Sequence, residues 1–158
     1  MKNILEFIEN SALKYPDKLA VADEEGGLTY GQMERLSRQI GAWIYEKTDG
    51  VRNKPVAVLL DKKPRSVAAY MGVVYSGNFY VVLDMPASRA ESILGTLNPV
   101  AVVTDIGHME KALELSRNGV DEDGCQGQEG ENKEVFRILN LDELDTSADQ
   151  SVLDAVRS

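Results

Sequence analysis

The feature that most constrains the fold is an alternation of unbroken apolar runs with segments of helical spacing. Apolar runs of strand length stand at residues 56–60, 79–83 and 100–104. Runs of this kind are typical of strands that are covered on both faces of a sheet. Segments with helical spacing, residues 64–77 and 88–97, separate the runs. The order strand, helix, strand, helix, strand predicts right-handed crossovers in a parallel sheet, and therefore an α/β fold.

Both crossover helices carry residues that favour helix ends. Pro64 suits the first position of a helix, and Gly77 can end that helix in a left-handed turn. Ser88 and Glu91 have the spacing of a capping box, which predicts that the next helix begins there. Asn98-Pro99 then ends it.

The first thirty residues predict a helix and a small hairpin. Apolar residues recur at helical spacing from Ile4 to Ala12, and Tyr15-Pro16 ends that pattern. Residues 19–30 hold two short apolar pieces on either side of a double glycine, which favours a hairpin. Thr29 has capping-box spacing to Gln32 and is expected to begin the following helix.

The C-terminal third is less regular. A helix is expected at about 108–116, and residues 118–134, with four glycines and a run of acids, predict a mobile loop. Residues 135–139 predict a fourth parallel strand, and residues 142–158 have only a weak helical pattern. We therefore expect an open three-layer sandwich with a mostly parallel sheet of about four strands and a small N-terminal hairpin.

The composition limits the partners. The net charge of −9 disfavours nucleic acid and anionic membrane surfaces, which attract basic proteins. No apolar run reaches the ~18 residues of a membrane span, and the acidic first residues do not resemble a signal peptide. We expect a cytoplasmic protein with no nucleic-acid or membrane partner.

Few residues suggest catalytic or metal chemistry. The single histidine, His108, and the single cysteine exclude a His- or Cys-rich zinc site. We interpret His108 as an exposed residue at the start of a helix. Neither a GxxxxGK[ST] loop nor a GxGxxG turn is present. Asp121, Asp123 and Gly124 do not have the spacing of an EF-hand, so we expect no calcium site.

Asp84, at the end of the run 79–83, is the most prominent acid. It could be a phosphoacceptor of a receiver-like domain, a metal ligand, or a turn residue that accepts backbone N–H bonds before Pro86. A receiver also needs paired acids and a lysine after other strands. Only Asp61 follows the first run and Asp105 the third, so the turn interpretation is favoured.

Two stretches resemble core motifs of the adenylate-forming enzymes, the AMP-binding superfamily. Residues 28–33, Leu-Thr-Tyr-Gly-Gln-Met, resemble that family's Leu-Thr-Tyr-x-Glu-Leu. Residues 56–89 are similar to its next block, which ends in roughly Leu-Lys-Ala-Gly-x-Ala-Tyr-x-Pro-Leu-Asp-Pro, although Val82 and Met85 replace two prolines. The matching positions, to which we assign structural roles only, are Leu28, Thr29, Tyr30, Gly77, Tyr80, Asp84, Pro86 and Arg89.

The resemblance covers about residues 4–105, is weak over 135–158, and implies that residues 1–158 are the N-terminal portion of an adenylation domain. An aspartate at position 84 favours the amino-acid-activating members, such as non-ribosomal peptide synthetase adenylation domains and D-alanine carrier-protein ligases. The family's phosphate loop, Thr-Ser-Gly-Ser-Thr-Gly-x-Pro-Lys-Gly, follows the matched region and is not in this chain.

The resemblance implies one activity for the longer parent enzyme and another expectation for this chain alone. The parent enzyme would use ATP and Mg to activate a carboxylate and would pass it to a carrier-protein or coenzyme A thiol. This chain alone would carry no catalytic, cofactor-binding or metal-binding residue, and would be inactive. Its partner would be the remainder of the parent, and self-association through the uncovered seam is expected. The alternatives are a free-standing, non-catalytic α/β interaction module and a receiver-like domain.

Overall fold

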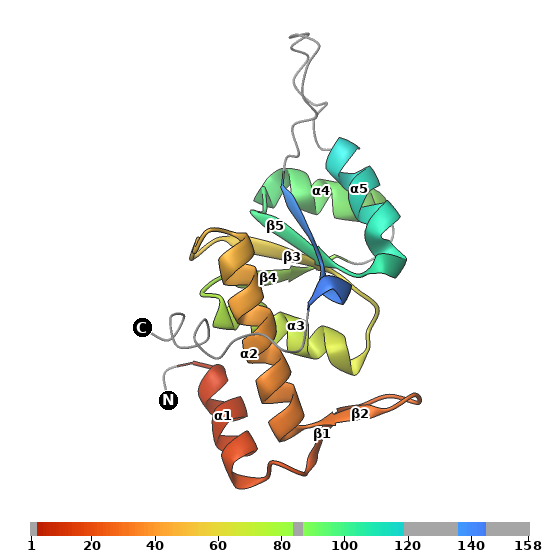
Figure 1. Cartoon of the computed structure of the whole chain (residues 1–158). Coiled ribbons are helices and arrows are strands. Elements are labelled where there is room, and N and C mark those ends of the chain that lie inside the picture. Colours follow the sequence, from red (N-terminus) through yellow and green to blue (C-terminus); the bar gives the residue numbers. More distant parts are fainter. Residues whose placement is uncertain (1–2, 84–86, 119–135, 145–158) are drawn as a thin grey trace, which may run out of the picture.

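The computed structural model describes residues 3–83, 87–118 and 136–144 (Figure 1). The elements in chain order are α1 (Leu5–Lys14), β1 (Leu19–Ala22), β2 (Gly27–Thr29), α2 (Tyr30–Lys47), β3 (Pro55–Leu59), α3 (Pro64–Tyr75), β4 (Phe79–Val82), α4 (Ala87–Leu97), β5 (Ala101–Thr104), the 3-10 turn η1 (Ile106–His108), α5 (Met109–Asn118), β6 (Arg137–Asn140) and the 3-10 turn η2 (Leu141–Glu143). Asp84, Pro86 and all but the first residue of the predicted mobile loop 118–134 lie outside the described residues.

The main sheet has four parallel strands in the order β4-β3-β5-β6. In the register, Ala57 of β3 stands between Val81 of β4 and Val102 of β5. The chain first builds outward from β3 to β4 and then crosses back to β5. This is the doubly wound arrangement of open α/β folds, and it confirms the predicted fold class.

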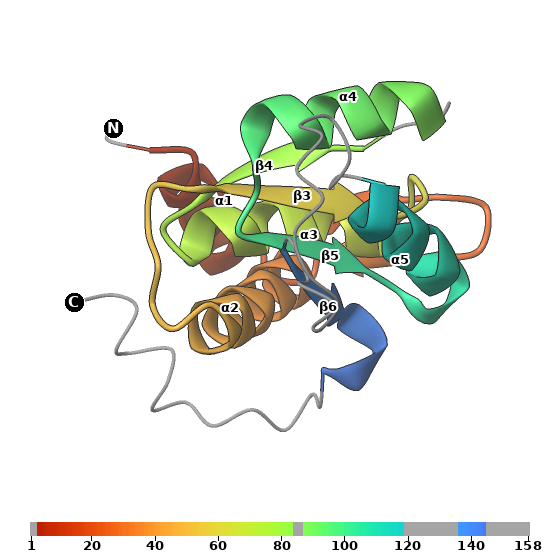
Figure 2. The same ribbon diagram turned by 90° about the horizontal axis from the view of Figure 1, so that it is seen from above.

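Alternate residues of the central strands supply two separate cores. Val56, Val58, Ala101 and Val103 pack with α2 and α3 on one face of the sheet. Ala57, Leu59 and Val102 pack with α4 and α5 on the other. Figure 2 shows the sheet between α2 on one side and α4 on the other. Burial on both faces explains why these runs are apolar except for Thr104, whose buried hydroxyl donates to the carbonyl oxygen of Leu59 at 3.0 Å.

One predicted strand differs in its surroundings. The run 79–83 was expected to be a buried strand, but β4 lies at the edge of the sheet, and Phe79 is 48% and Tyr80 39% exposed. Only Leu83, just after β4, is fully buried. The length of an apolar run does not distinguish an edge strand from a central one, because strand order depends on contacts between distant segments.

The N-terminal helix and the hairpin form a small unit at the start of α2 (Figure 1). Ile8 of α1 packs against Met33 and Met71, with the hairpin residues against them. The helix predicted between Ile4 and Tyr15 is confirmed as α1. Of its apolar residues, Ile8 is buried, whereas Phe7 is 53% exposed.

The helix ends were predicted with mixed success. Pro64 is the first residue of α3, and Gly77 follows that helix with φ of 85°, as expected. In contrast, α4 begins at Ala87, so Ser88 lies inside its first turn and is not its N-cap. The helix expected at 108–116 is η1 followed by α5, and the fourth strand is displaced to Arg137–Asn140. Within the described part of the chain, no helix is both long and apolar enough to cross a membrane.

Candidate functional site

The loops after β3 and β5 meet at the carboxyl end of the sheet. These two strands are neighbours, but the chain leaves β3 toward α3 on one face and leaves β5 toward α5 on the other. In open α/β sheets, the crevice outside the carboxyl ends of two such strands is the usual place for a ligand. We call the five side chains that gather here the carboxyl-edge cluster: Asp61, Arg65, Asp105, His108 and Asp142.

His108 connects the two loops. Asp105 caps η1, because its Oδ1 accepts the backbone N–H of His108 at 3.0 Å, and the same oxygen lies 2.6 Å from His108 Nδ1. On the other side of the ring, Nε2 lies 3.2 Å from Oδ1 of Asp61. The hydrogen bond with Asp105 raises the pKa of His108 above its ordinary value, and the charges of Asp105 and Asp61 raise it further.

Asp142 connects the same turn to α3 and η2. Its Oδ2 accepts the backbone N–H of Ile106 at 2.8 Å, and its Oδ1 lies 2.7 Å from a guanidinium nitrogen of Arg65. The N–H of Ile106 and the hydrogen bond with Arg65 lower the pKa of Asp142. This carboxylate therefore fastens η1 to the start of α3.

A cavity of about 200 Å³ borders three residues of the cluster, and its lining is Leu60, Asp61, Lys63, Arg65, Ser66 and Asp105. Its two cations are partnered. Lys63 Nζ lies 2.8 Å from Glu25 of the hairpin, and Arg65 is held by Asp142. The cavity is thus lined by opposite charges that balance locally. Among the residues that the structure describes, no group of three or more His, Cys, Asp or Glu side chains could hold a metal ion.

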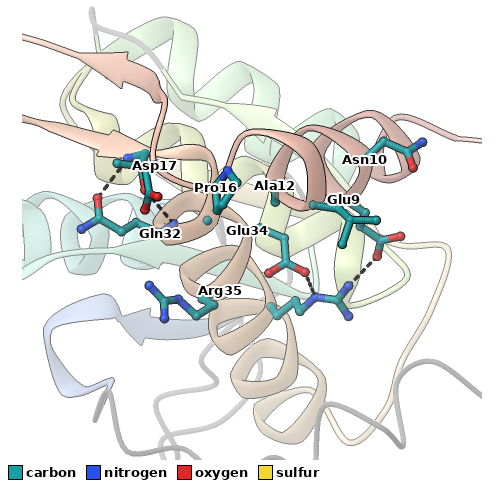
Figure 3. A pocket seen from close by; sticks show the side chains of 12 residues that line it. Glu9, Asn10, Ala12, Pro16, Asp17, Gln32, Glu34 and Arg35 are labelled. Carbon is teal, nitrogen blue, oxygen red and sulfur yellow. Dashed lines mark hydrogen bonds and ion pairs between the residues drawn. The ribbon is translucent and has the colours of Figure 1, made fainter.

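A larger, open hollow of about 760 Å³ lies between α1 and α2 (Figure 3). Beside it, Arg38 contacts Glu34 on its own helix and lies 2.7 Å from Glu9 of α1. The hydroxyl of Tyr75 in α3 donates to Glu9 at 3.3 Å, and burial raises the pKa of Tyr75 above its usual range. These contacts join three helices, so we interpret them as framework and not as a reactive site.

Among the family-motif residues that the structure describes, Thr29 lines the larger hollow, and none lines the cavity at the carboxyl end of the sheet. Leu28 and Thr29 end the hairpin and Tyr30 begins α2, while Arg89 lies in α4. Tyr80 of β4 stacks on Tyr70 of α3 with 5.0 Å between ring centroids. Two motif residues have the local roles that the sequence predicts: Thr29 forms a capping box with Gln32, and Gly77 follows α3 in the left-handed conformation.

The sequence did not predict the carboxyl-edge cluster. His108 directly precedes α5, as expected for a residue at a helix start, but its side chain is only 28% exposed and lies between two carboxylates. A signal existed, because Asp61 and Asp105 each follow closely on an apolar run, and parallel strands bring such ends to one edge. The sequence did not place His108 near these two aspartates, because it did not predict the 3-10 turn η1 that precedes α5.

Comparisons with known proteins agree on one family. Residues 8–156 match the model of the family described as AMP-binding enzyme. N-(5-amino-5-carboxypentanoyl)-L-cysteinyl-D-valine synthase from Penicillium rubens is 28% identical over 116 residues, which are 72% of this chain and 3% of that protein. Bacitracin synthase 3 from Bacillus licheniformis is 33% identical over 97 residues, or 60% of this chain and 2% of that protein.

Solved structures share the fold. The fatty acyl-adenylate ligase from L. pneumophila superposes with a TM-score of 0.72 at 17% identity, over 98% of this chain and 25% of that one. This chain therefore spans a small part of the length of the proteins it matches.

Proposed function

Because the chain belongs to the AMP-binding enzyme family, we propose that it forms the N-terminal structural portion of an adenylation domain in a longer enzyme. That enzyme would activate a carboxylate with ATP, giving an acyl-adenylate and pyrophosphate, and would transfer the acyl group to a thiol. The observation that carries this proposal is the family match, which runs over nearly the whole chain from residue 8 to residue 156.

The residues of this chain do not fit a site for ATP and Mg. The sequence holds neither a GxxxxGK[ST] loop nor the family's phosphate loop, and the described residues offer no acidic or histidine cluster for a metal ion. Phosphoryl and adenylyl transfer need charge-neutralising groups around the phosphates. We therefore assign ATP and Mg to the remainder of the longer enzyme and derive no chemical step from this chain.

We assign amino acids as the substrate class and a carrier-protein thiol as the acceptor. The synthase from Penicillium rubens is named for a product that contains L-cysteinyl and D-valine units, and this supports an amino-acid substrate. Asp84 supports it too, because the motif that it matches carries aspartate in amino-acid-activating members. The contribution of this chain would be a rigid sheet on which the rest of the domain packs.

The test uses the protein encoded by the complete reading frame that contains this chain. Hydroxylamine is added with ATP and Mg to separate pools of amino acids, fatty acids and aromatic acids, and hydroxamates are identified by mass spectrometry. We expect ATP-dependent hydroxamates from the amino-acid pool. Hydroxamates from fatty acids alone would overturn the substrate class, and a folded protein that gives none from any pool would overturn the adenylating function.

A further inference from the structure

His108 is the only histidine of the chain, and its ring lies between carboxylates from two different loops. Asp105 is local, because it caps the turn that contains His108. Asp61 belongs to the loop after β3, lines the cavity together with Asp105, and has a side chain that is 69% exposed. The contact between Nε2 and Asp61 is therefore a direct bridge across the crevice between the loops.

The protonation state of the ring decides whether this bridge can hold. An imidazolium has two N–H donors, one for each carboxylate, whereas a neutral imidazole has one donor and one lone pair. The 2.6 Å contact to Asp105 is the shorter of the two, so a neutral ring keeps its proton on Nδ1. The lone pair of Nε2 then faces the Asp61 carboxylate, and that contact becomes repulsive.

We propose that His108 is a pH-dependent latch, which as imidazolium holds the loop after β3 against the turn after β5 and as neutral imidazole releases it. The inference does not depend on the adenylating function. It concerns the crevice at the carboxyl end of the sheet, where the loops border the cavity of about 200 Å³.

Among the neighbouring charged groups, the imidazole ring of His108 is the one whose change of charge would open or close the latch. Lys63 and Arg65, which line the cavity, are paired with Glu25 and Asp142, and on α5 Lys111 is paired with Glu114. Of these side chains, an imidazole is the one whose charge ordinarily changes between about pH 5 and 8.

The direction of the effect follows from the raised pKa of His108 in the folded protein. The stabilisation of the fold by the imidazolium contacts of His108 is fully present below the unfolded-state pKa of about 6.5. It is lost as the pH rises through the higher folded-state pKa. The latch is therefore closed in mildly acidic solution and opens as the pH rises above the folded-state pKa.

The experiment is a titration of the 158-residue chain followed by NMR, from about pH 5 to about pH 8. Because the chain has one histidine, its ring resonances need no assignment among several. We expect a midpoint above the ordinary value, and we expect the backbone amides of Asp61, Lys62 and Lys63 to shift with that same midpoint. A midpoint at or below about 6.5 would overturn the proposal, as would loop amides that do not follow the ring.

Two variants separate the bridge from the local cap. Asp61→Asn should lower the ring midpoint by about 0.2–0.7 pH units, the range expected for an exposed ion pair, and abolish the response of the loop amides. Glu114→Gln is the control, because its carboxylate pairs with Lys111 and should leave both readouts unchanged. Equal midpoints in the wild type and Asp61→Asn would show that Asp105 alone determines the titration, and the latch would be rejected.

Discussion

Thr29 is the last residue of β2, and its side chain caps the start of α2. Its Oγ1 accepts the N–H of Gln32 at 3.2 Å, and its own N–H donates to Oε1 of Gln32 at 2.9 Å. This reciprocal pair was predictable from the sequence because both partners lie within four residues. The contacts of His108 were not, since Asp61 reaches it from another loop through the packing of the whole sheet.

The cap gives the first prediction at the residue scale. Thr29→Ala should lower the free energy of unfolding by about 0.5–2 kcal/mol, because Gln32 loses its acceptor at the start of α2. Urea denaturation measures the loss. The control is Thr96→Ala in α4, where the exposed hydroxyl donates only to Ser92 O of its own helix at 3.0 Å and alanine is a better helix former. Equal destabilisation by both variants would contradict the claim that the Thr29 cap stabilises α2.

At the scale of elements, α2 and α3 approach closely through two glycines. A Cβ on Gly41 would lie 2.5 Å from Cβ of Tyr75 and 2.9 Å from the carbonyl oxygen of Gly72. A Cβ on Gly72 would lie 2.5 Å from a methyl carbon of Ile40. The two helices can therefore cover one face of the sheet together only while both positions lack side chains.

The second prediction compares two glycine-to-alanine changes in helices. Gly41→Ala should destabilise the fold by about 1–3 kcal/mol, because the helices must separate or shift. Gly95→Ala in α4 is the matched control, since a Cβ there meets nothing within 4 Å, and it should stabilise by up to about 1 kcal/mol. Thermal unfolding of both variants decides the matter, and a neutral Gly41→Ala would contradict the close packing.

The type of each element could be predicted from the sequence, but the order of the strands in the sheet could not. The apolar runs of β3 and β5 predicted central strands correctly, because both faces of these strands are buried in the two cores. The similar run of β4 was wrongly predicted to be a buried strand. Residues 79–83 contain no feature from which it follows that β5 pairs with the other side of β3 and leaves β4 at the edge. Element type was thus encoded locally, whereas strand order and the cluster at the carboxyl edge depend on distant contacts.

At the scale of the whole molecule, the exposed edge of the sheet is the prominent surface. Among the described strands of the main sheet, β4 and β6 each have a partner on one side only, and Phe79, Tyr80 and Val82 of β4 are all at least 39% exposed. An open edge with apolar side chains tends to be covered by another segment. In the proposed parent enzyme, the rest of the adenylation domain would cover it.

The third prediction follows for the 158-residue chain alone. We expect it to self-associate through β4, so light scattering at tens of micromolar, a range we choose for a weak edge contact, should give a mass above that of one chain. Phe79→Lys should restore the monomer. Leu13→Lys, which changes an 83% exposed leucine on α1, is the control and should not. A monomeric wild type, or equal behaviour of the two variants, would count against association through this edge.

The central claim is that this chain is the scaffold portion of an adenylating enzyme and does not itself bind ATP productively. ATP–pyrophosphate exchange with amino acids tests it most directly, measured in parallel on the protein encoded by the complete reading frame and on the 158-residue chain. We predict exchange by the complete protein and none above a buffer blank by the chain. Exchange by the 158-residue chain, or none by the complete protein when it is folded, would contradict the claim.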